Sequence, residues 1–236
     1  MEPPKIERVP ILHVLRVFVN DDGEWGNPLG VFLDGGRVPE GRRQDVAAAL
    51  GFSETVFVED RAEGRVRIHT PAVELPFAGH PTVGVAWLLA HVGSTVETLH
   101  TPAGEVAVRS EGEDAFVVAR PEWAPRFAYR QLACPAEVRG IDAVTVDIDT
   151  YAWAWIDESA GTIRARAFVP ELGIAEDEAT GSAAIALCAQ LGRRLVIHQG
   201  HGSVLRCEPL ADGTVELGGR TRLVECRDDY GEAARP

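Results

Sequence analysis

The chain has 236 residues, of which 45% are hydrophobic and 25% charged, a composition typical of a soluble globular protein with one large or two medium domains. The net charge of −13 argues against nucleic-acid binding, which needs clustered Lys and Arg, and no apolar run approaches the ~20 residues of a membrane span. The four cysteines form no CxxC pair and the first ten residues lack the apolar core of a signal peptide. We therefore expect no metal site, no disulfide framework and a cytoplasmic location.

The first half of the chain carries strand signals interrupted by one amphipathic helix. Aliphatic residues over 11–19 predict a strand, and the Asp, Gly, Asn and Pro residues of 20–30 predict a loop. An exposed amphipathic helix is expected over 39–50, ending at Gly51. Further strands are predicted at 31–33, 52–59, 65–70, 96–100, 105–109 and 115–120.

The second half repeats this pattern after a segment of weak periodicity. Residues 121–140 are rich in proline and aromatic residues, and we place the crossover between two domains there. The predicted lobes are therefore an N-terminal lobe over 1–120 and a C-terminal lobe over 121–236, with a C-terminal tail able to cross back to the first. Strands are predicted at 144–148, 152–156, 163–168, 194–198, 203–208, 214–217 and 222–226.

Two short, fully apolar helices are the most informative feature of the chain. Residues Ala78 to Thr82 lead into the first, Val83 to Leu89, and residues Glu176 to Ser182 lead into the second, Ala183 to Leu191. A helix that is apolar all round and too short to span a membrane is surrounded by protein. Because strands precede and follow each helix, we predict an α+β fold with two pseudo-symmetric lobes. Each lobe is expected to be a curved, mostly antiparallel, barrel-like sheet wrapped around a central helix.

The starts of these helices form a candidate anion site. A helix N-terminus has unpaired N–H groups and the positive end of the helix dipole, so two such ends placed face to face would hold a carboxylate. His80 stands at the first start, where the dipole favours the neutral ring, although a capping or packing role is the alternative. At the second start, Asp177 either caps N–H groups or points into a cleft, and Ser182 would donate to a ligand carboxylate.

Glu54 is the candidate acid or base. Strand alternation places Phe52, Glu54, Val56 and Val58 on one face, so the carboxylate shares an otherwise apolar surface. Burial raises the pKa of a carboxylic acid, and a raised pKa suits proton transfer. The alternative is a glutamate at a strand end that reaches solvent or a helix N-terminus.

Several enzyme classes lack support because their motifs are absent from the sequence. There is no G-x-S-x-G elbow of an α/β-hydrolase, no G-x-x-x-x-G-K-[ST] loop and no G-x-G-x-x-G fingerprint. No cysteine lies at either helix start, where a thiol would gain acidity.

Motifs along most of the chain resemble the phenazine-biosynthesis isomerase (PhzF-like) family within the diaminopimelate epimerase superfamily. Their order and spacing together are specific, although each alone is unremarkable. They are Val17-Phe18, Gly26-Asn27-Pro28-Leu29-Gly30-Val31, Ser53-Glu54-Thr55-Val56-Phe57-Val58, the segments from Thr70 to Thr82 and from Glu176 to Ala184, Gln199-Gly200, and Val215-Glu216-Leu217-Gly218-Gly219.

This resemblance implies two similar lobes with the active site between them, a homodimer and no cofactor. In phenazine-forming members, a glutamate of the Ser-Glu-Thr motif moves a proton on a dihydro-hydroxyanthranilate. Carried over to the matching positions, the resemblance implies Glu54 as acid and base, His80 and Asp177 as proton relays or substrate contacts, and Ser53, Gly79, Gly181 and Ser182 as substrate-binding residues.

The substrate is left open, because the chain is shorter than is usual for the family and residues 121–151 are compressed. The leading hypothesis is a cofactor-independent isomerase that moves a carbon-bound proton of a small carboxylate-bearing substrate. One alternative is an epimerase that uses carboxylate and histidine, because Ala78 and Thr180 stand where related epimerases place thiols. The other is a non-catalytic protein that binds small acids.

Overall fold

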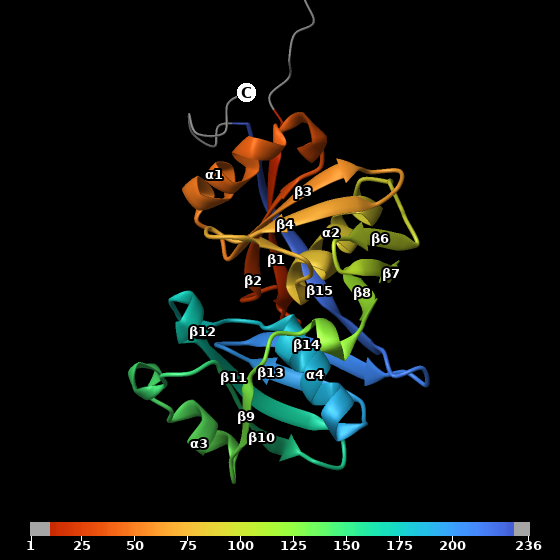
Figure 1. The fold of residues 1–236 in the computed structure, drawn as a ribbon. Helices are drawn as coiled ribbons and strands as arrows, with labels where there is room; N and C mark the ends of the chain where they lie inside the picture. The colour runs from red at the N-terminus through yellow and green to blue at the C-terminus, as the bar shows by residue number, and fades with distance from the viewer. Residues whose placement is uncertain (1–9, 229–236) are drawn as a thin grey trace, which may run out of the picture.

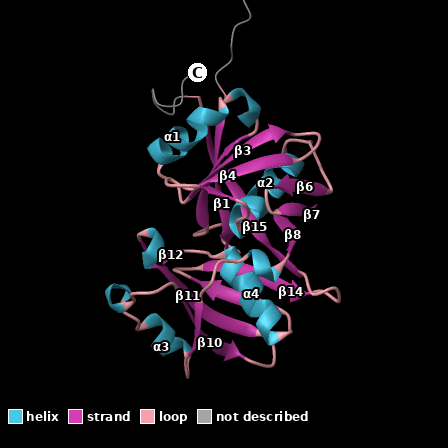
Figure 2. Ribbon diagram, in the orientation of Figure 1, coloured by secondary structure: helices cyan, strands magenta, loops and turns pink. Residues whose placement is uncertain are grey.

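The computed structural model describes residues 10–228, so the N-terminal segment in which we expect no leader, and the last eight residues, lie outside the described residues. Two lobes are stacked along the long axis of the molecule (Figure 1). Each lobe has one central helix, with α2 enclosed by strands and α4 packed against the sheet (Figure 2). This arrangement confirms the predicted α+β fold.

The N-terminal lobe is a sheet closed around helix α2. Its strands follow the order β1-β2-β3-β4-β6-β7-β8-β15, and β15 pairs with both β8 and β1. The pairings are antiparallel except for β2–β3 and β4–β6. The elements are β1 (Leu12–Val19), β2 (Asn27–Phe32), η1 (Gly35–Arg37), α1 (Glu40–Leu50), β3 (Glu54–Asp60), β4 (Arg65–His69), β5 (Glu74–Leu75), α2 (Gly79–His91), β6 (Thr98–Thr101), β7 (Gly104–Glu111) and β8 (Asp114–Ala119).

In the C-terminal lobe the same sheet continues from β15 and packs against helix α4. Its order is β15-β14-β13-β11-β10-β9, with β12 paired to β11. The elements are η2 (Pro121–Trp123), β9 (Ala128–Gln131), α3 (Pro135–Arg139), η3 (Ala143–Thr145), β10 (Thr150–Asp157), β11 (Thr162–Val169), η4 (Pro170–Leu172), β12 (Ile174–Asp177), α4 (Gly181–Leu191), β13 (Leu195–Gln199), β14 (Ser203–Pro209) and β15 (Val215–Arg227).

One hydrophobic core runs through both lobes, because α2 and α4 are buried at their centres. Every residue of α2 from Gly79 to Leu89 is buried, and the core includes residues of β1 to β4 above and of β10, β11, β13 and β14 below. A smaller cluster lies under α1 and includes Val46 and Phe57. Phe52 packs against this smaller cluster, so its expected place on the face of Glu54 was wrong.

Strand β15 is continuous where two separate strands were predicted. Its first part pairs with β14 and β8, and its second part pairs with β1, so β15 contributes to both lobes. Gly218 lies inside this strand, at a position where a side chain would collide with the ring of Phe116. This glycine makes room for packing, although in sequence it is typical of a turn.

Two other local predictions were wrong. The predicted loop 20–30 includes the start of β2, where a Cβ atom on Gly30 would lie 2.9 Å from the Phe52 ring. The predicted strand 144–148 is instead the short 3-10 turn η3, followed by a loop. Asp142 causes this turn by accepting a hydrogen bond from the Val144 N–H group.

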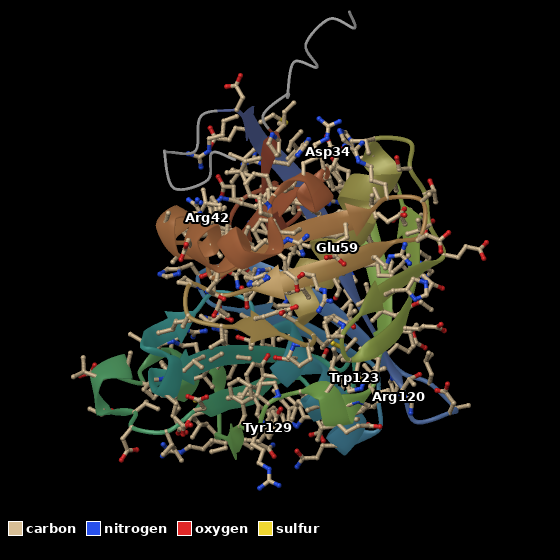
Figure 3. All side chains as sticks on the ribbon, turned by 45° about the horizontal axis from the view of Figure 1, so that its top comes forward. Asp34, Arg42, Glu59, Arg120, Trp123 and Tyr129 are labelled. Carbon is tan, nitrogen blue, oxygen red and sulfur yellow. The ribbon has the colours of Figure 1, made fainter. Side chains whose placement is uncertain are left out.

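The first part of the segment 121–140 contacts α4, whereas its last part, α3, packs on β10 and β11. In the first part, Tyr129 donates a hydrogen bond to the carbonyl of Ala183 at 3.1 Å. Trp123 packs on Phe77, with 5.3 Å between the ring centres. Figure 3 labels both Trp123 and Tyr129 beside this part of the C-terminal lobe. The weak periodicity of the segment thus reflects short elements that pack on different neighbours.

Candidate functional site

The N-termini of α2 and α4 meet at the junction of the lobes. A Cβ atom on Gly79 would lie 2.8 Å from the carbonyl carbon of Gly181, and one on Gly181 would lie 3.0 Å from the His80 nitrogen. Only glycine allows this approach. Neither helix start has a side-chain cap, and the N-cap residues are Ala78 and Thr180. The two positive helix ends therefore face each other, as the sequence predicts; an anion bound there stays a prediction.

Glu54 lies beside this meeting point, at the first residue of β3. Its side chain is 16% exposed, so the carboxylate is held largely away from solvent. Burial raises the pKa of Glu54 to about 7, and a hydrogen bond from Ser53 opposes the rise. The Ser53 hydroxyl also lies 3.5 Å from the carbonyl oxygen of Pro28. Glu54 thus has the pKa of a group that can release and accept a proton near neutral pH.

His80 faces Glu54 from the first turn of α2. Its Nε2 lies 3.3 Å from Glu54 Oε2, and its side chain is 5% exposed. The two atoms are buried, and the described residues supply neither with a well-aligned hydrogen bond. Burial lowers the pKa of His80 to about 4, against the opposing influence of Asp177 and of the Pro28 carbonyl. The ring is therefore neutral at pH 7.

Asp177 reaches the same place from the end of β12. Its Oδ1 accepts a hydrogen bond from Asn27 Nδ2 at 2.8 Å, and its Oδ2 accepts one from the Thr180 hydroxyl at 2.6 Å. Asp177 therefore does not cap the backbone of α4 and instead faces the junction. Burial raises its pKa, as does the charge of Glu54, while His80 and the two hydrogen bonds oppose the rise.

A buried chain of hydrogen bonds supports Asp177 from behind. The Tyr151 hydroxyl donates to Gln199 Oε1 at 3.0 Å, and Gln199 Nε2 donates to the Thr180 hydroxyl at 2.9 Å. The Thr180 hydroxyl accepts from Gln199 and donates its hydrogen to Asp177, so the chain of hydrogen bonds fixes the position of Asp177. The sequence analysis predicts no role for these residues or for Asn27. Asn27 and Gln199 could have been found as the polar residues of the Gly-Asn-Pro and Gln-Gly motifs.

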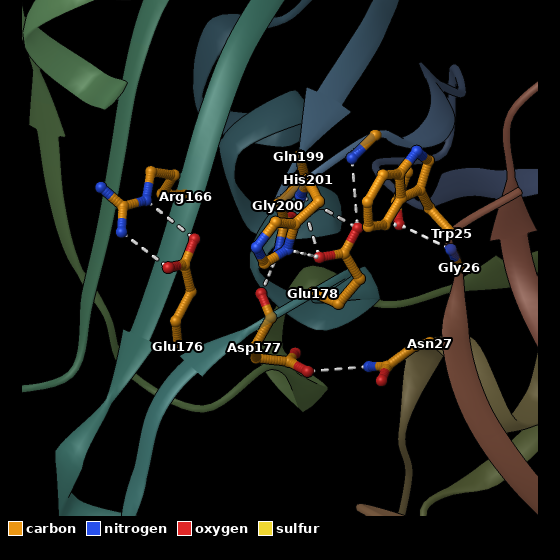
Figure 4. Close-up of polar contacts among 12 residues, drawn as sticks. Trp25, Gly26, Asn27, Arg166, Glu176, Asp177, Glu178, Gln199, Gly200 and His201 are labelled. Carbon is orange, nitrogen blue, oxygen red and sulfur yellow. Dashed lines mark hydrogen bonds and ion pairs between the residues drawn. The ribbon is translucent and has the colours of Figure 1, made fainter. Parts of the chain in front are cut away.

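A second set of contacts joins the lobes at the rim of the site (Figure 4). Glu178 accepts hydrogen bonds from His201 Nδ1 at 2.8 Å and from the Ser203 hydroxyl at 2.8 Å. Ser203 accepts one in turn from the Gly26 N–H group of the N-terminal lobe, at 3.0 Å. The Trp25 ring stacks on His201, with 5.3 Å between the ring centres.

The structure therefore brings together Glu54, His80, Asp177, Gly79 and Gly181. Ser53 adjoins Glu54 and half-buried Ser182 is the second residue of α4. Among residues 10–228, no group of three or more His, Cys, Asp and Glu side chains is placed to hold a metal ion. No helix within that range is long and apolar enough to cross a membrane.

Comparisons with known proteins agree with this architecture. The sequence model of the family described as phenazine biosynthesis-like protein (PhzC-PhzF) matches residues 16–138 and 142–214. A trans-2,3-dihydro-3-hydroxyanthranilate isomerase of Pseudomonas aeruginosa is 30% identical over 247 residues, covering 88% of this chain and 87% of that protein. An uncharacterized isomerase of the same species is 33% identical over 200 residues, covering 72% and 77%.

Solved structures extend the similarity to epimerases. A phenazine biosynthesis protein of the PhzF family from Enterococcus faecalis has a TM-score of 0.75 at 24% identity, covering 92% of this chain and 97% of that one. A hydroxyproline epimerase from Agrobacterium vitis shares the fold with a TM-score of 0.59 at 13% identity, covering 97% and 99%. The chain therefore belongs to the phenazine biosynthesis-like (PhzF-like) family and is an isomerase of this type, related in fold to epimerases.

Proposed function

We propose that this isomerase needs no cofactor and uses Glu54 to move a proton between two carbon atoms of a small, carboxylate-bearing substrate held between the lobes. One observation carries the proposal. Glu54 Oε2 and His80 Nε2 are buried, close together and without hydrogen-bond partners among the described residues, beside the two helix N-termini. Buried polar atoms without partners are costly, so their presence at this point supports a functional role.

The proton transfer follows from the chemistry of these groups. The Glu54 carboxylate takes a proton from a substrate carbon, and the electron pair of the broken C–H bond moves into the adjacent unsaturated system. The protonated Glu54 then delivers the proton to a second carbon, where the new C–H bond forms. N–H groups at the starts of α2 and α4, with the Ser182 hydroxyl, would hold the substrate carboxylate. The neutral ring of His80, together with Asp177, would orient the reacting part of the substrate.

The substrate class follows from the paired helix ends and from the named relative. A trans-2,3-dihydro-3-hydroxyanthranilate carries a carboxylate and is the first compound to test, together with other small cyclic and acyclic acids. We also propose that the protein is a homodimer, as the family resemblance implies, which light scattering would test. All four cysteines are free thiols, which supports a location in the reducing cytoplasm.

The experiment is a screen of these acids in D2O, read by NMR for deuterium at carbon. We expect exchange and conversion with the natural enzyme, and a loss of about 10²- to 10⁴-fold with Glu54→Gln, because that amide cannot carry the proton. The control is Glu59→Gln on the same strand β3, labelled in Figure 3, which pairs with Arg43 and lies outside the site.

Three results would contradict the proposal. Exchange that survives in Glu54→Gln would remove Glu54 from the chemistry. Inversion of a stereocentre without a shifted double bond would identify an epimerase that works without thiols. Tight binding of an acid with no exchange at any carbon would identify a binding protein.

A further inference from the structure

Asn27 is a buried side chain that contacts both lobes at the site. It is 3% exposed at the start of β2. Its Nδ2 donates to Asp177 Oδ1 at 2.8 Å and to the carbonyl oxygen of Ala179 at 3.1 Å. Both partners are acceptors that belong to the C-terminal lobe. They therefore determine the orientation of the Asn27 amide, with its NH2 group toward them.

The same nitrogen faces the ring of His80. Asn27 Nδ2 lies 3.5 Å from His80 Nδ1. An amide NH2 group has hydrogens to donate and no lone pair to accept with, so a hydrogen on Nδ1 would point at another donor. In a neutral imidazole one ring nitrogen carries the hydrogen and the other does not. The ring also has the carbonyl oxygen of Pro28 as a hydrogen-bond acceptor. The contact between Nδ1 and the Asn27 NH2 group favours a bare Nδ1, with the hydrogen on Nε2.

We propose that Asn27 is a positioning residue that selects the His80 tautomer protonated at Nε2, and so aims that N–H group at the Glu54 carboxylate. The inference rests on the roles proposed above for Glu54 and His80. It adds a coupling between the lobes: Asn27 takes its orientation from Asp177 and Ala179, so the reactive tautomer is specified only when the two lobes are in contact.

The consequence concerns the hydrogen that His80 offers to the site. With Nε2 protonated, the 3.3 Å separation from Glu54 Oε2 places a donor opposite an acceptor. With Nδ1 protonated, two bare acceptor atoms would face each other whenever Glu54 is ionised. The tautomer thus decides whether His80 can support Glu54 or a substrate atom placed between them.

The test is nitrogen-15 NMR of the full chain, labelled at histidine and without ligand, with the His80 signals assigned by their loss in His80→Gln. We expect the chemical shift of a protonated nitrogen at Nε2 and of a bare nitrogen at Nδ1. In Asn27→Ala the two shifts should move toward each other as the Nδ1-protonated form gains population. Ser203→Ala is the matched control, because it removes another hydrogen bond between the lobes, from the Gly26 N–H group, and should leave the His80 shifts unchanged.

Protonation of His80 at Nδ1 in the natural protein would overturn the inference, as would an unchanged tautomer in Asn27→Ala. If Asn27→Ala does not fold, Asn27→Ser serves as the second variant, and the measurement on the natural protein still decides. Because this readout needs no substrate, it can fail or succeed independently of the deuterium exchange that tests the proposed function.

Discussion

Burial acts on Glu54 and His80 in opposite directions. It raises the pKa of the acid to about 7 and lowers that of the base to about 4, because in both cases the uncharged form tolerates the loss of water better. Between these values both groups are neutral in the folded protein. In that range neither Glu54 nor His80 carries a charge, so Glu54 does not repel an anionic substrate.

This shift predicts a pH-dependent effect of Glu54→Gln on stability. The folded protein keeps the Glu54 proton from its ordinary pKa of 4.5 up to about 7, whereas the unfolded chain releases it in that window. The natural protein therefore loses stability from this group as the pH rises through the window, and glutamine does not. The free energy of unfolding of Glu54→Gln, relative to the natural protein, should increase by up to about 1.4 kcal/mol per pH unit there and level off above pH 7.

Urea unfolding at a series of pH values measures this difference, with Glu59→Gln as the control. Burial of Glu59 is outweighed by hydrogen bonds and charge from Arg43 and Arg67, so its pKa is lowered. Its stabilising contribution is present above pH 4.5 and is lost below it, so Glu59→Gln should show no slope between pH 4.5 and 7. A flat difference for Glu54→Gln would mean that this carboxylate is solvated.

At the scale of elements, the decisive contact is the meeting of two helix starts. Gly79 and Gly181 touch backbone to backbone, and Leu217 of β15 packs on both. No side chain can enter between the helices without pushing them apart. The small size of these residues is therefore a condition for both helix dipoles to act at one place.

Gly79→Ala should destabilise the protein by about 1–3 kcal/mol, because the new methyl group would lie 2.8 Å from the Gly181 backbone. Urea unfolding measures the loss. The matched control is Gly41→Ala in α1, another helical glycine, where the added Cβ atom meets nothing within 4 Å. That substitution should not destabilise the protein and should stabilise it by at most about 0.5–1 kcal/mol, because alanine favours helix and Gly41 lies in the first turn. Equal effects of the two substitutions would show that the helix starts are not in contact.

At the scale of the whole molecule, the lobes share a strand and a core. Strand β15 pairs with β14 of one lobe and with β1 of the other, and the main hydrophobic cluster includes both Trp87 of α2 and Trp153 of β10. Neither lobe can unfold without breaking pairings that the other uses. Such shared structure favours cooperative unfolding.

We therefore expect one unfolding transition for the two lobes. Fluorine NMR of the protein labelled with fluorotryptophan should report the same urea midpoint for Trp87 and Trp153. Each lobe thus carries its own reporter, and no substitution is needed except to assign the signals. Two separate midpoints would show that the lobes are independent folding units joined by a linker.

Much of the site was predictable because it depends on local pattern. Alternation along β3 places Glu54 with Val56 and Val58, whose burial around α2 the structure shows. The two apolar helices have no polar face, so a surrounding sheet is the arrangement that removes them from water. Glycine misled the local predictions at Gly30 and Gly218, where it makes room for a neighbouring ring within a strand rather than forming a turn.

By itself the sequence determined the two lobes, their central helices and the candidate residues at the helix starts, since periodicity and local propensity act over short distances. Only the tertiary structure decided that Asn27 meets Asp177, 150 positions away, and that Tyr151, Gln199 and Thr180 stand behind it. Those contacts depend on how the two lobes, which share β15, pack against each other. Docking is governed by shape and by the pairing of buried polar groups, neither of which leaves a periodic trace in the chain.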